Sequence, residues 1–323
     1  MNVQSNVKSL FSKRGFLFYN SIYGPNPGFT DYGPNGCAMA RNLTNIWWRT
    51  IVQQNQNVTG YEGSTFIGRD VMRAWPEHRR VLSTTQGVVD TTDVAIETVL
   101  SKKDLPDDKL RELLKDKLSI LHLRPSAIHS VLGNFHSIIS AASPKLPFGV
   151  AQTGTCFVPG RVDSEQSEQK TNTTHSPAAS EETHLDLTIF LPGHSREASV
   201  AWTNAFADSR LCWWQSLLIN TPSRVTLNKT EKATTVTYES PSTGERLVLE
   251  TVELLDDNVL EAHRQALKGK AKFMILNQKG IALEKPHVLH THSSIAHCVN
   301  ALALDALGDR ADEGTCCLTY TCC

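Results

Sequence analysis

Three histidines lie close together near the end of the sequence, at His287, His290 and His292. Imidazole is a common zinc ligand, but zinc requires several ligands that converge on one point. Successive residues of a strand point to opposite faces, so only His290 and His292 would share a face there. Because no third ligand is evident, we predict no metal site and no bound cofactor.

The eight cysteines form two groups. Four are scattered among apolar or turn residues, namely Cys37, Cys156, Cys212 and Cys298. We predict that these are buried free thiols in a reducing compartment. The other four crowd the last eight residues as Cys316, Cys317, Cys322 and Cys323. Their spacing lacks the CxxC pairs of zinc sites, so we expect a frayed or abnormal terminus there.

Basic side chains could contact nucleic acid only in local patches, because the net charge of the 323 residues is −1. A dedicated nucleic-acid-binding domain is usually basic overall. Two clusters are candidate contacts with DNA phosphates: Arg69, Arg73, Arg79 and Arg80 in the first, and Lys268, Lys270 and Lys272 in the second. The alternative is ordinary solvated surface charge, so any DNA binding is expected to be weak and confined to patches.

Helical spacing of apolar residues occurs in three stretches that could position these groups. The first helix is predicted to carry Met39, Leu43, Ile46, Trp47 and Ile51. A helical insertion is predicted over residues 88–123, where Pro106 begins a helix and leucines form one apolar stripe. A third helix is predicted over residues 295–307.

Strands are predicted at residues 185–191, 233–238, 247–249 and 273–277. Residues 160–184 contain almost no large apolar side chains and cannot bury a core, so we predict a disordered insertion there. Because strands follow helices without regular βαβ alternation, we predict an α+β architecture with a mainly antiparallel sheet.

The first 13 residues are interpreted as an N-terminal extension to a core that begins at Arg14. The first acidic residue is Asp31, after Lys8, Lys13 and Arg14. A basic segment without acids is typical of organellar transit peptides, and equally of an exposed basic terminus. No apolar run approaches the roughly 18–20 residues of a membrane span, so we expect no membrane partner.

The segment from residue 14 to residue 49 is rich in glycine and aromatic side chains. Residues 14–18 read RGFLF, residues 22–24 read IYG, and residues 28–36 read GFTDYGPNG. Together with the following helix, which ends in WWR, this segment resembles the start of glycyl-tRNA synthetases. The resemblance implies a class II aminoacyl-tRNA synthetase core over residues 14–310, with an antiparallel sheet flanked by helices. In that family the segment contains a dimer-forming helix and strand.

A second segment resembles the synthetases but differs from them at the positions that bind ATP in that family. Residues 145–157 read KLPFGVAQTGTCF and resemble a synthetase stretch that ends in Arg-x-Glu. The resemblance implies that this Arg contacts the α-phosphate of ATP and that the Glu helps to hold the nucleotide. Here Val158 and Gly160 occupy the two positions. Neither can replace the fixed cation or the carboxylate that adenylate formation requires.

Charged groups are missing from two further places. Residues 285–297 read KPHVLHTHSSIAH and resemble a synthetase motif whose last Arg packs on the γ-phosphate side of ATP, where this chain has His297. The Arg-Pro-Glu-Thr of the amino-acid pocket becomes RPSA, which keeps Arg124 but puts Ser126 in place of the carboxylate. We therefore predict a degenerate active site with no catalytic residues. The alternative is a divergent glycine–tRNA ligase.

A Gly-x-Cys-Phe ending at Phe157, without the Arg-x-Glu, also resembles the accessory subunits of mitochondrial DNA polymerase, which descend from the synthetase fold. Residues 197–202, 210–214 and 236–251 resemble the same family. The resemblance covers most of residues 12–307 and implies a non-catalytic processivity subunit in mitochondria. The implied partners are the polymerase catalytic subunit and double-stranded DNA, with a homodimer in some lineages.

The end of the chain departs from that family. Its members continue into an α/β domain like an anticodon-binding domain, which this chain lacks before Cys323. Residues 311–323 resemble nothing in the family. Either the lineage lost the domain or the gene sequence is truncated or frame-shifted, and we favour the second.

Overall fold

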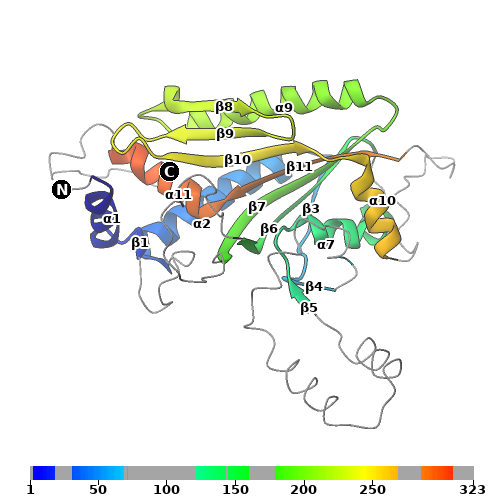
Figure 1. Ribbon diagram of the computed structural model, residues 1–323, viewed down its shortest axis with the longest axis horizontal. Helices are drawn as coiled ribbons and strands as arrows, with labels where there is room; N and C mark the ends of the chain where they lie inside the picture. The colour runs from blue at the N-terminus through cyan, green and yellow to red at the C-terminus, as the bar shows by residue number, and fades with distance from the viewer. Residues whose placement is uncertain are drawn as a thin grey trace, which may run out of the picture.

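A single seven-stranded sheet forms the centre of the protein (Figure 1). The computed structural model describes residues 3–18, 31–68, 71, 121–142, 145–159, 179–267 and 285–307. In spatial order the strands are β3 (Val58–Gly60), β6 (Phe148–Pro159), β7 (Ala179–Leu191), β11 (His287–Ser294), β10 (Arg246–Leu254), β9 (Thr234–Glu239) and β8 (Val225–Lys229). Every neighbouring pair is antiparallel except β3 and β6, which are parallel. The predicted α+β architecture with a mainly antiparallel sheet is confirmed.

Three helices and a π-helical turn cover one face of the sheet, called here the helix-covered face. They are α2 (Pro34–Trp48), the π turn η2 (Arg49–Gln53), α9 (Arg196–Leu217) and α11 (Ile295–Leu307). Helix α9 begins where Ser195 Oγ accepts a hydrogen bond from the Ala198 amide, and α2 begins with a proline. Trp47 and Trp214 are buried in this core.

The opposite face, called here the front face, is apolar only at one end. There α7 (Ile128–Gly133), α8 (Phe135–Ala142) and α10 (Asp257–Ala266) pack on Phe148, Phe190 and Val288. The rings of Phe148 and Phe190 stack with centroids 4.8 Å apart. In Figure 1, α7 and α10 lie together at the right-hand end of the sheet. Since side chains alternate along a strand, the remainder of this face is set by the polar residues of β6, β7 and β11.

Smaller elements complete the described fold. Helix α1 (Val3–Lys13) places Phe11 in the main core. Strands β1 (Leu17–Phe18) and β2 (Asp31–Tyr32) form one two-stranded sheet, and β4 (Phe66–Gly68) and β5 (Leu121–Leu123) form another. A short 3-10 helix, η5 (Pro222–Arg224), leads into β8.

The glycine-rich start of the sequence has a specific structural cause. Gly15 has φ of +67°, a left-handed conformation that favours glycine. A side chain at Gly36 would collide with the backbone carbonyl of Phe16. The RGFLF and GPNG segments therefore pack backbone against backbone, which larger residues would prevent.

The structure confirms several predicted elements and corrects others. The predicted helix over 295–307 coincides with α11, and three of the predicted strands fall in β7, β9 and β10. The predicted strand at 273–277 and most of the helical insertion lie outside the described residues. Residues 121–123, the end of that insertion, form strand β5 and not a helix, because they pair with β4.

Two further predictions are wrong for identified residues. Strand β7 begins at Ala179, so residues 179–184 of the predicted disordered insertion are ordered by pairing with β6. The remaining residues of that insertion, 160–178, lie outside the described part of the chain. Cys212 is exposed on α9 and Cys37 is half-buried, whereas Cys156 and Cys298 are buried free thiols as predicted. No helix among the described residues is long and apolar enough to cross a membrane.

Candidate functional site

The polar part of the front face brings together side chains from three adjacent strands. The register places Gln152 opposite Asp186 and Gly154 opposite His184 between β6 and β7. Asp186 lies opposite His292 between β7 and β11. We call this group the polar patch, and define it by Gln152, Cys156, Glu182, His184, Asp186, Thr188, His290 and His292. Four of its members, Gln152, Cys156, Asp186 and Thr188, are completely buried.

A carboxylate–imidazole pair lies at the centre of the polar patch. Asp186 Oδ2 and His290 Nε2 are 2.8 Å apart, and both side chains are almost fully buried. The rings of His290 and His292 stack with centroids 5.2 Å apart, so the prediction that these histidines share a face is confirmed. The ring of His292 also stacks on His184 at 5.3 Å. Three imidazoles therefore form a row across β7 and β11.

A second carboxylate–imidazole pair lies at the end of the row. His184 Nε2 is 3.2 Å from Glu182 Oε2, and Ser180 Oγ donates to the other Glu182 oxygen at 2.8 Å. Burial alone would lower the pKa of His184, but hydrogen bonding to Cys156 and Glu182 raises it to about 10. Burial alone would raise the pKa of Glu182, but bonding to His184 lowers it to about 2. This pair is therefore held as an ion pair near neutral pH.

Arg124 is the cation that the sequence retains beside this face, and its guanidinium is enclosed by protein. Nε donates to the Thr155 carbonyl at 2.9 Å and Nη1 donates to the Gly63 carbonyl at 3.0 Å. A side chain at Gly154 would collide with Nη2, so the glycine of the Gly-x-Cys-Phe motif makes room for this cation. Arg124 is 1% exposed, which makes it a structural tie between β6 and the segment before α7. Because Nε and Nη1 are bonded to protein oxygens, most of the guanidinium is engaged by the protein itself.

The structure places three of the predicted degenerate positions around this face. Val158 lies on β6 opposite Ser180, two residues from Glu182. His297 is exposed on α11, and its proximity helps to lower the pKa of Glu182. Ser126 lies near Arg124, before α7, and its Oγ is buried without a hydrogen-bond partner. Val158 and His297 are therefore both near Glu182, whereas Ser126 belongs to the Arg124 side.

The other predicted site residues lie outside the described part of the chain. These are Gly160 and the candidate DNA contacts Arg69, Arg73, Arg79, Arg80, Lys268, Lys270 and Lys272. Their roles stay predictions. Among the described residues, no group of three or more His, Cys, Asp or Glu side chains has the arrangement of a metal site.

Sequence reasoning missed Glu182, His184 and Asp186 as site residues. Glu182 and His184 fell in the stretch interpreted as disordered, because polar residues at alternate positions lower its mean hydropathy. The signal that could have found them is the alternation itself: Glu182, His184, Asp186 and Thr188 occur at every second position. Polar residues on one side and Leu185 and Leu187 on the other indicate a strand between a polar site and a core.

Several buried polar atoms on the front face have hydrogen-bonding capacity that the described residues do not use. Asp186 Oδ1 and Thr188 Oγ1 are buried and have no hydrogen-bond partner among the residues that the structure describes. Ser294 Oγ, at the end of β11, is in the same condition. Buried polar atoms in native proteins are usually bonded to protein, water or ligand. The arrangement is thus suited to holding water or a small polar molecule.

Comparisons with known proteins identify glycine–tRNA ligases among the relatives of this chain. No protein-family model matches the chain. The glycine–tRNA ligase of Borreliella afzelii is 25% identical over 173 residues, which is 47% of this chain and 38% of the ligase. That of Cutibacterium acnes is 26% identical over 256 residues, covering 67% of this chain and 51% of the ligase. The ligase of Chlorobaculum tepidum is 23% identical over 380 aligned residues, covering 95% and 76%.

A solved structure agrees with the fold. The prolyl-tRNA synthetase of Cryptosporidium parvum, complexed with L-proline and AMP, superposes with a TM-score of 0.56 and 12% identity. The match covers 94% of this chain and 51% of that synthetase. The matched stretch is 38% of the Borreliella afzelii ligase, so the chain spans only part of the length of such relatives. The chain is homologous to glycine–tRNA ligases and has the fold of a class II aminoacyl-tRNA synthetase.

Proposed function

We propose that this chain is a synthetase-derived protein that forms no aminoacyl adenylate and serves as an accessory subunit of mitochondrial DNA polymerase. One observation carries the first half. The positions that correspond to the phosphate-binding arginines are occupied by Val158 and His297, and the retained Arg124 is 1% exposed with its Nε and Nη1 bonded to backbone carbonyls. Without free cations at those positions, the negative charge that builds up on ATP during adenylation is not stabilised.

The charges that remain near those positions reinforce this proposal. Glu182 is held ionised beside Val158 and His297, and Asp186 lies buried in the same polar patch. Glu182 and His184 form an ion pair whose charges cancel, so the pair does not replace the missing arginines as a source of positive charge.

The accessory role is supported by sequence similarity at Gly154, Cys156 and Phe157 and at residues 197–202 and 210–214. It implies a mitochondrial location, binding to the polymerase catalytic subunit, patch-based contact with double-stranded DNA, and a homodimer in some lineages. Residues 69–80 and 268–272 are the candidate DNA contacts on this proposal. The whole role depends on surfaces beyond the polar patch.

Glycine-dependent exchange of pyrophosphate into ATP tests the first half of the proposal. We expect no exchange above a protein-free blank, with a bacterial glycine–tRNA ligase assayed in parallel as the positive control. Exchange at enzyme-like rates would refute the non-catalytic assignment and support the alternative, a divergent glycine–tRNA ligase. That alternative is favoured by the names of the relatives and by the retention of Arg124.

Primer extension by the mitochondrial polymerase catalytic subunit tests the second half. The protein should co-purify with the catalytic subunit and lengthen its products on a singly primed template. An Arg69→Ala/Arg73→Ala variant should lengthen products less than the wild type does, and its effect should depend less steeply on salt concentration, because phosphate contacts have been removed. No lengthening at saturating subunit would refute the accessory role while leaving the exchange result unaffected.

A further inference from the structure

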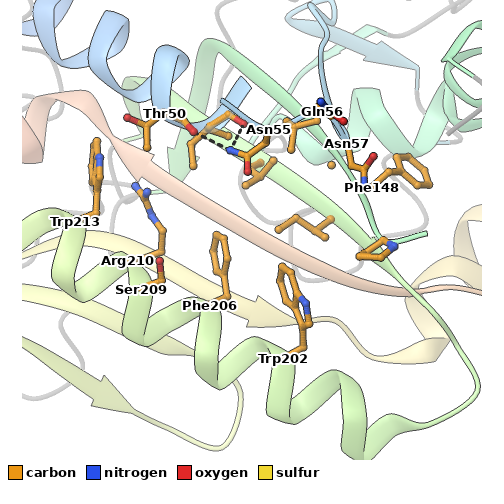
Figure 2. Close-up of a pocket in the computed structure, with 16 residues that line it drawn as sticks. Thr50, Asn55, Gln56, Asn57, Phe148, Trp202, Phe206, Ser209, Arg210 and Trp213 are labelled. Atoms are coloured by element: carbon orange, nitrogen blue, oxygen red, sulfur yellow. Dashed lines mark hydrogen bonds between the residues drawn. The ribbon is translucent and has the colours of Figure 1, made fainter. Parts of the chain in front are cut away.

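A cavity of about 460 Å³ lies between α9 and the segment that joins η2 to β3 (Figure 2). It is separate from the polar patch, because its floor is made by Leu187 and Ile189, which face the helix-covered side of β7. One wall is aromatic and comes from α9, with Trp202, Phe206 and Trp213. Volumes of this size are typical of sites for small organic ligands, and such sites are lined mainly by apolar and aromatic groups.

The aromatic wall is only partly covered by the protein's own side chains. Trp202 is 38% exposed, and its ring stacks on Phe206 with centroids 5.5 Å apart and planes 10° from parallel. The two stacked rings therefore border the cavity with aromatic carbon on successive turns of α9. Aromatic side chains at a cavity wall can bind planar rings by stacking.

A buried cation with uncommitted donors lies at one end of the same cavity. Arg210 lines the cavity and is 3% exposed. Both of its hydrogen bonds to Glu250 come from Nε, at 2.8 and 3.0 Å, and its Nη2 is buried without a partner. The guanidinium carbon lies 4.1 Å from the centroid of the Trp213 ring, which holds the group in place. The glutamate neutralises the charge but leaves N–H donors that need an acceptor.

The opposite wall supplies an acceptor. Asn55 Nδ2 donates to the carbonyls of Thr50 and Ile51, at 2.8 and 3.1 Å. Because both amide hydrogens are used at the end of the π turn, the acceptor Oδ1 is the group that Asn55 has left to bond a ligand. In Figure 2, the Arg210 side chain extends from α9 toward the segment that carries Thr50 and Asn55.

We propose that this cavity binds a purine base of the guanine type. The ring would lie on the aromatic wall, with acceptors O6 and N7 toward Arg210 and donors N1–H and N2–H toward Asn55. Arginine pairs with this acceptor edge in many nucleic-acid complexes. Adenine is disfavoured, because its exocyclic amine would place a donor against the guanidinium donors. The inference rests on the cavity and not on the proposed polymerase role.

Calorimetric titration tests the proposal with two probes, guanosine and a single-stranded oligothymidine that contains one central guanine. We expect saturable guanosine binding, with adenosine at least about tenfold weaker. Phe206→Ala and Trp202→Ala should each weaken guanosine binding by about tenfold. Val200→Ala is the matched control, because Val200 is 45% exposed on the same helix and does not line the cavity. Thermal unfolding of each variant establishes that it is folded before titration.

The two probes distinguish the sources of the base. Binding of guanosine alone, or equal binding of both probes, supports a free nucleoside or nucleotide as the ligand. Much tighter binding of the oligonucleotide, lost in Phe206→Ala, supports a base of single-stranded nucleic acid. No binding of either probe, or affinity unchanged in both aromatic variants, overturns the proposal. Dissociation of a wild-type dimer on Phe206→Ala, without guanosine binding, overturns it in favour of a second copy of the chain.

Discussion

The two faces of the central sheet treat buried carboxylates in different ways. On the helix-covered face, Glu250 accepts hydrogen bonds from Arg210, Trp214 and Thr291, and both of its oxygens are engaged. On the front face, Asp186 pairs with His290 through one oxygen, and its other oxygen is buried without a partner. Glu250 is 2% exposed and Asp186 is completely buried, so solvent access does not explain the difference.

This difference distinguishes the Glu250 network, which stabilises the fold, from the polar patch, which has the features of a ligand-binding site. A buried polar atom without a partner costs about 1–3 kcal/mol, and a face that only had to be stable would not need several. The helix-covered face satisfies its carboxylate from α9 and β11. The front face keeps polar side chains whose partners are not all supplied by the protein, as in sites that hold polar molecules.

The largest expected effect is at Glu250. Glu250→Gln leaves Arg210 as a buried cation without a counter-charge, so we expect a loss of about 3–5 kcal/mol in the free energy of unfolding, measured by urea denaturation. Glu239→Gln is the matched control, since Glu239 and Arg246 form an exposed ion pair and the change should cost under about 1 kcal/mol. Equal losses in the two variants would contradict the assignment of Glu250 as the satisfied carboxylate of the core.

Thr291 belongs to the same hydrogen-bond network as Glu250 and provides a second test of it. Its Oγ1 donates to Glu250 Oε1 at 2.6 Å, and the residue is 2% exposed. Thr291→Val removes a hydrogen bond to a charged group while keeping the side-chain shape, so we expect a loss of about 1.5–3 kcal/mol in the free energy of unfolding. A double-mutant cycle with Glu250→Gln should show coupling between the two positions. Strict additivity would show that the two residues do not form one network.

His184 should make the stability of the front face depend on pH. Its pKa rises from 6.5 to about 10 on folding, so its stabilisation is fully present below pH 6.5 and is lost as pH rises toward 10. The difference in unfolding free energy between the wild type and His184→Gln should therefore shrink by about 1–2 kcal/mol across that range. The pKa of Glu182 falls from 4.5 to about 2, so its contribution is lost only below pH 4.5.

His263→Gln serves as the control for that measurement. Burial lowers the pKa of His263 from 6.5 to about 4. Its protonation therefore destabilises the protein only as pH drops below 6.5 and has no effect on stability above that pH. Its difference from the wild type should therefore stay constant between pH 6.5 and 10. A constant difference for His184→Gln as well would show that His184 is not held as a cation by Glu182 and Cys156.

The sequence predicted the parts of the fold that hydrophobic periodicity marks. Helix α11 and the second half of β7 were predicted correctly, because their apolar residues follow the helical and strand periods. Motif comparison predicted Val158 and His297 as altered positions, and these assignments stay predictions. Residues 179–184 were misinterpreted because a strand that faces a polar site has the composition of a disordered segment.

Other features depend on contacts that local patterns do not encode. Arg210 and Glu250 are 40 residues apart and meet only because α9 packs across β10. The enclosure of Arg124 likewise depends on Thr155 and Gly63, which are distant in sequence. Whether a retained arginine is a ligand-binding group or a structural tie is decided by these partners, which the sequence alone does not show.

The smallest expected effect, and the one with the opposite sign, is at Thr188. Its Oγ1 is buried on the front face without a partner among the described residues, and Thr188 lies directly opposite His290 in the pairing of β7 with β11. Thr188→Val replaces an unpaired hydroxyl by a methyl group of similar shape, so we expect the free energy of unfolding to rise by up to about 1 kcal/mol. Thr291→Val is the same substitution on the adjacent strand and should lower it. Opposite signs would confirm that the protein satisfies the Thr291 hydroxyl and not the Thr188 hydroxyl, whereas destabilisation at both positions would show that the Thr188 hydroxyl is also hydrogen-bonded in the folded protein.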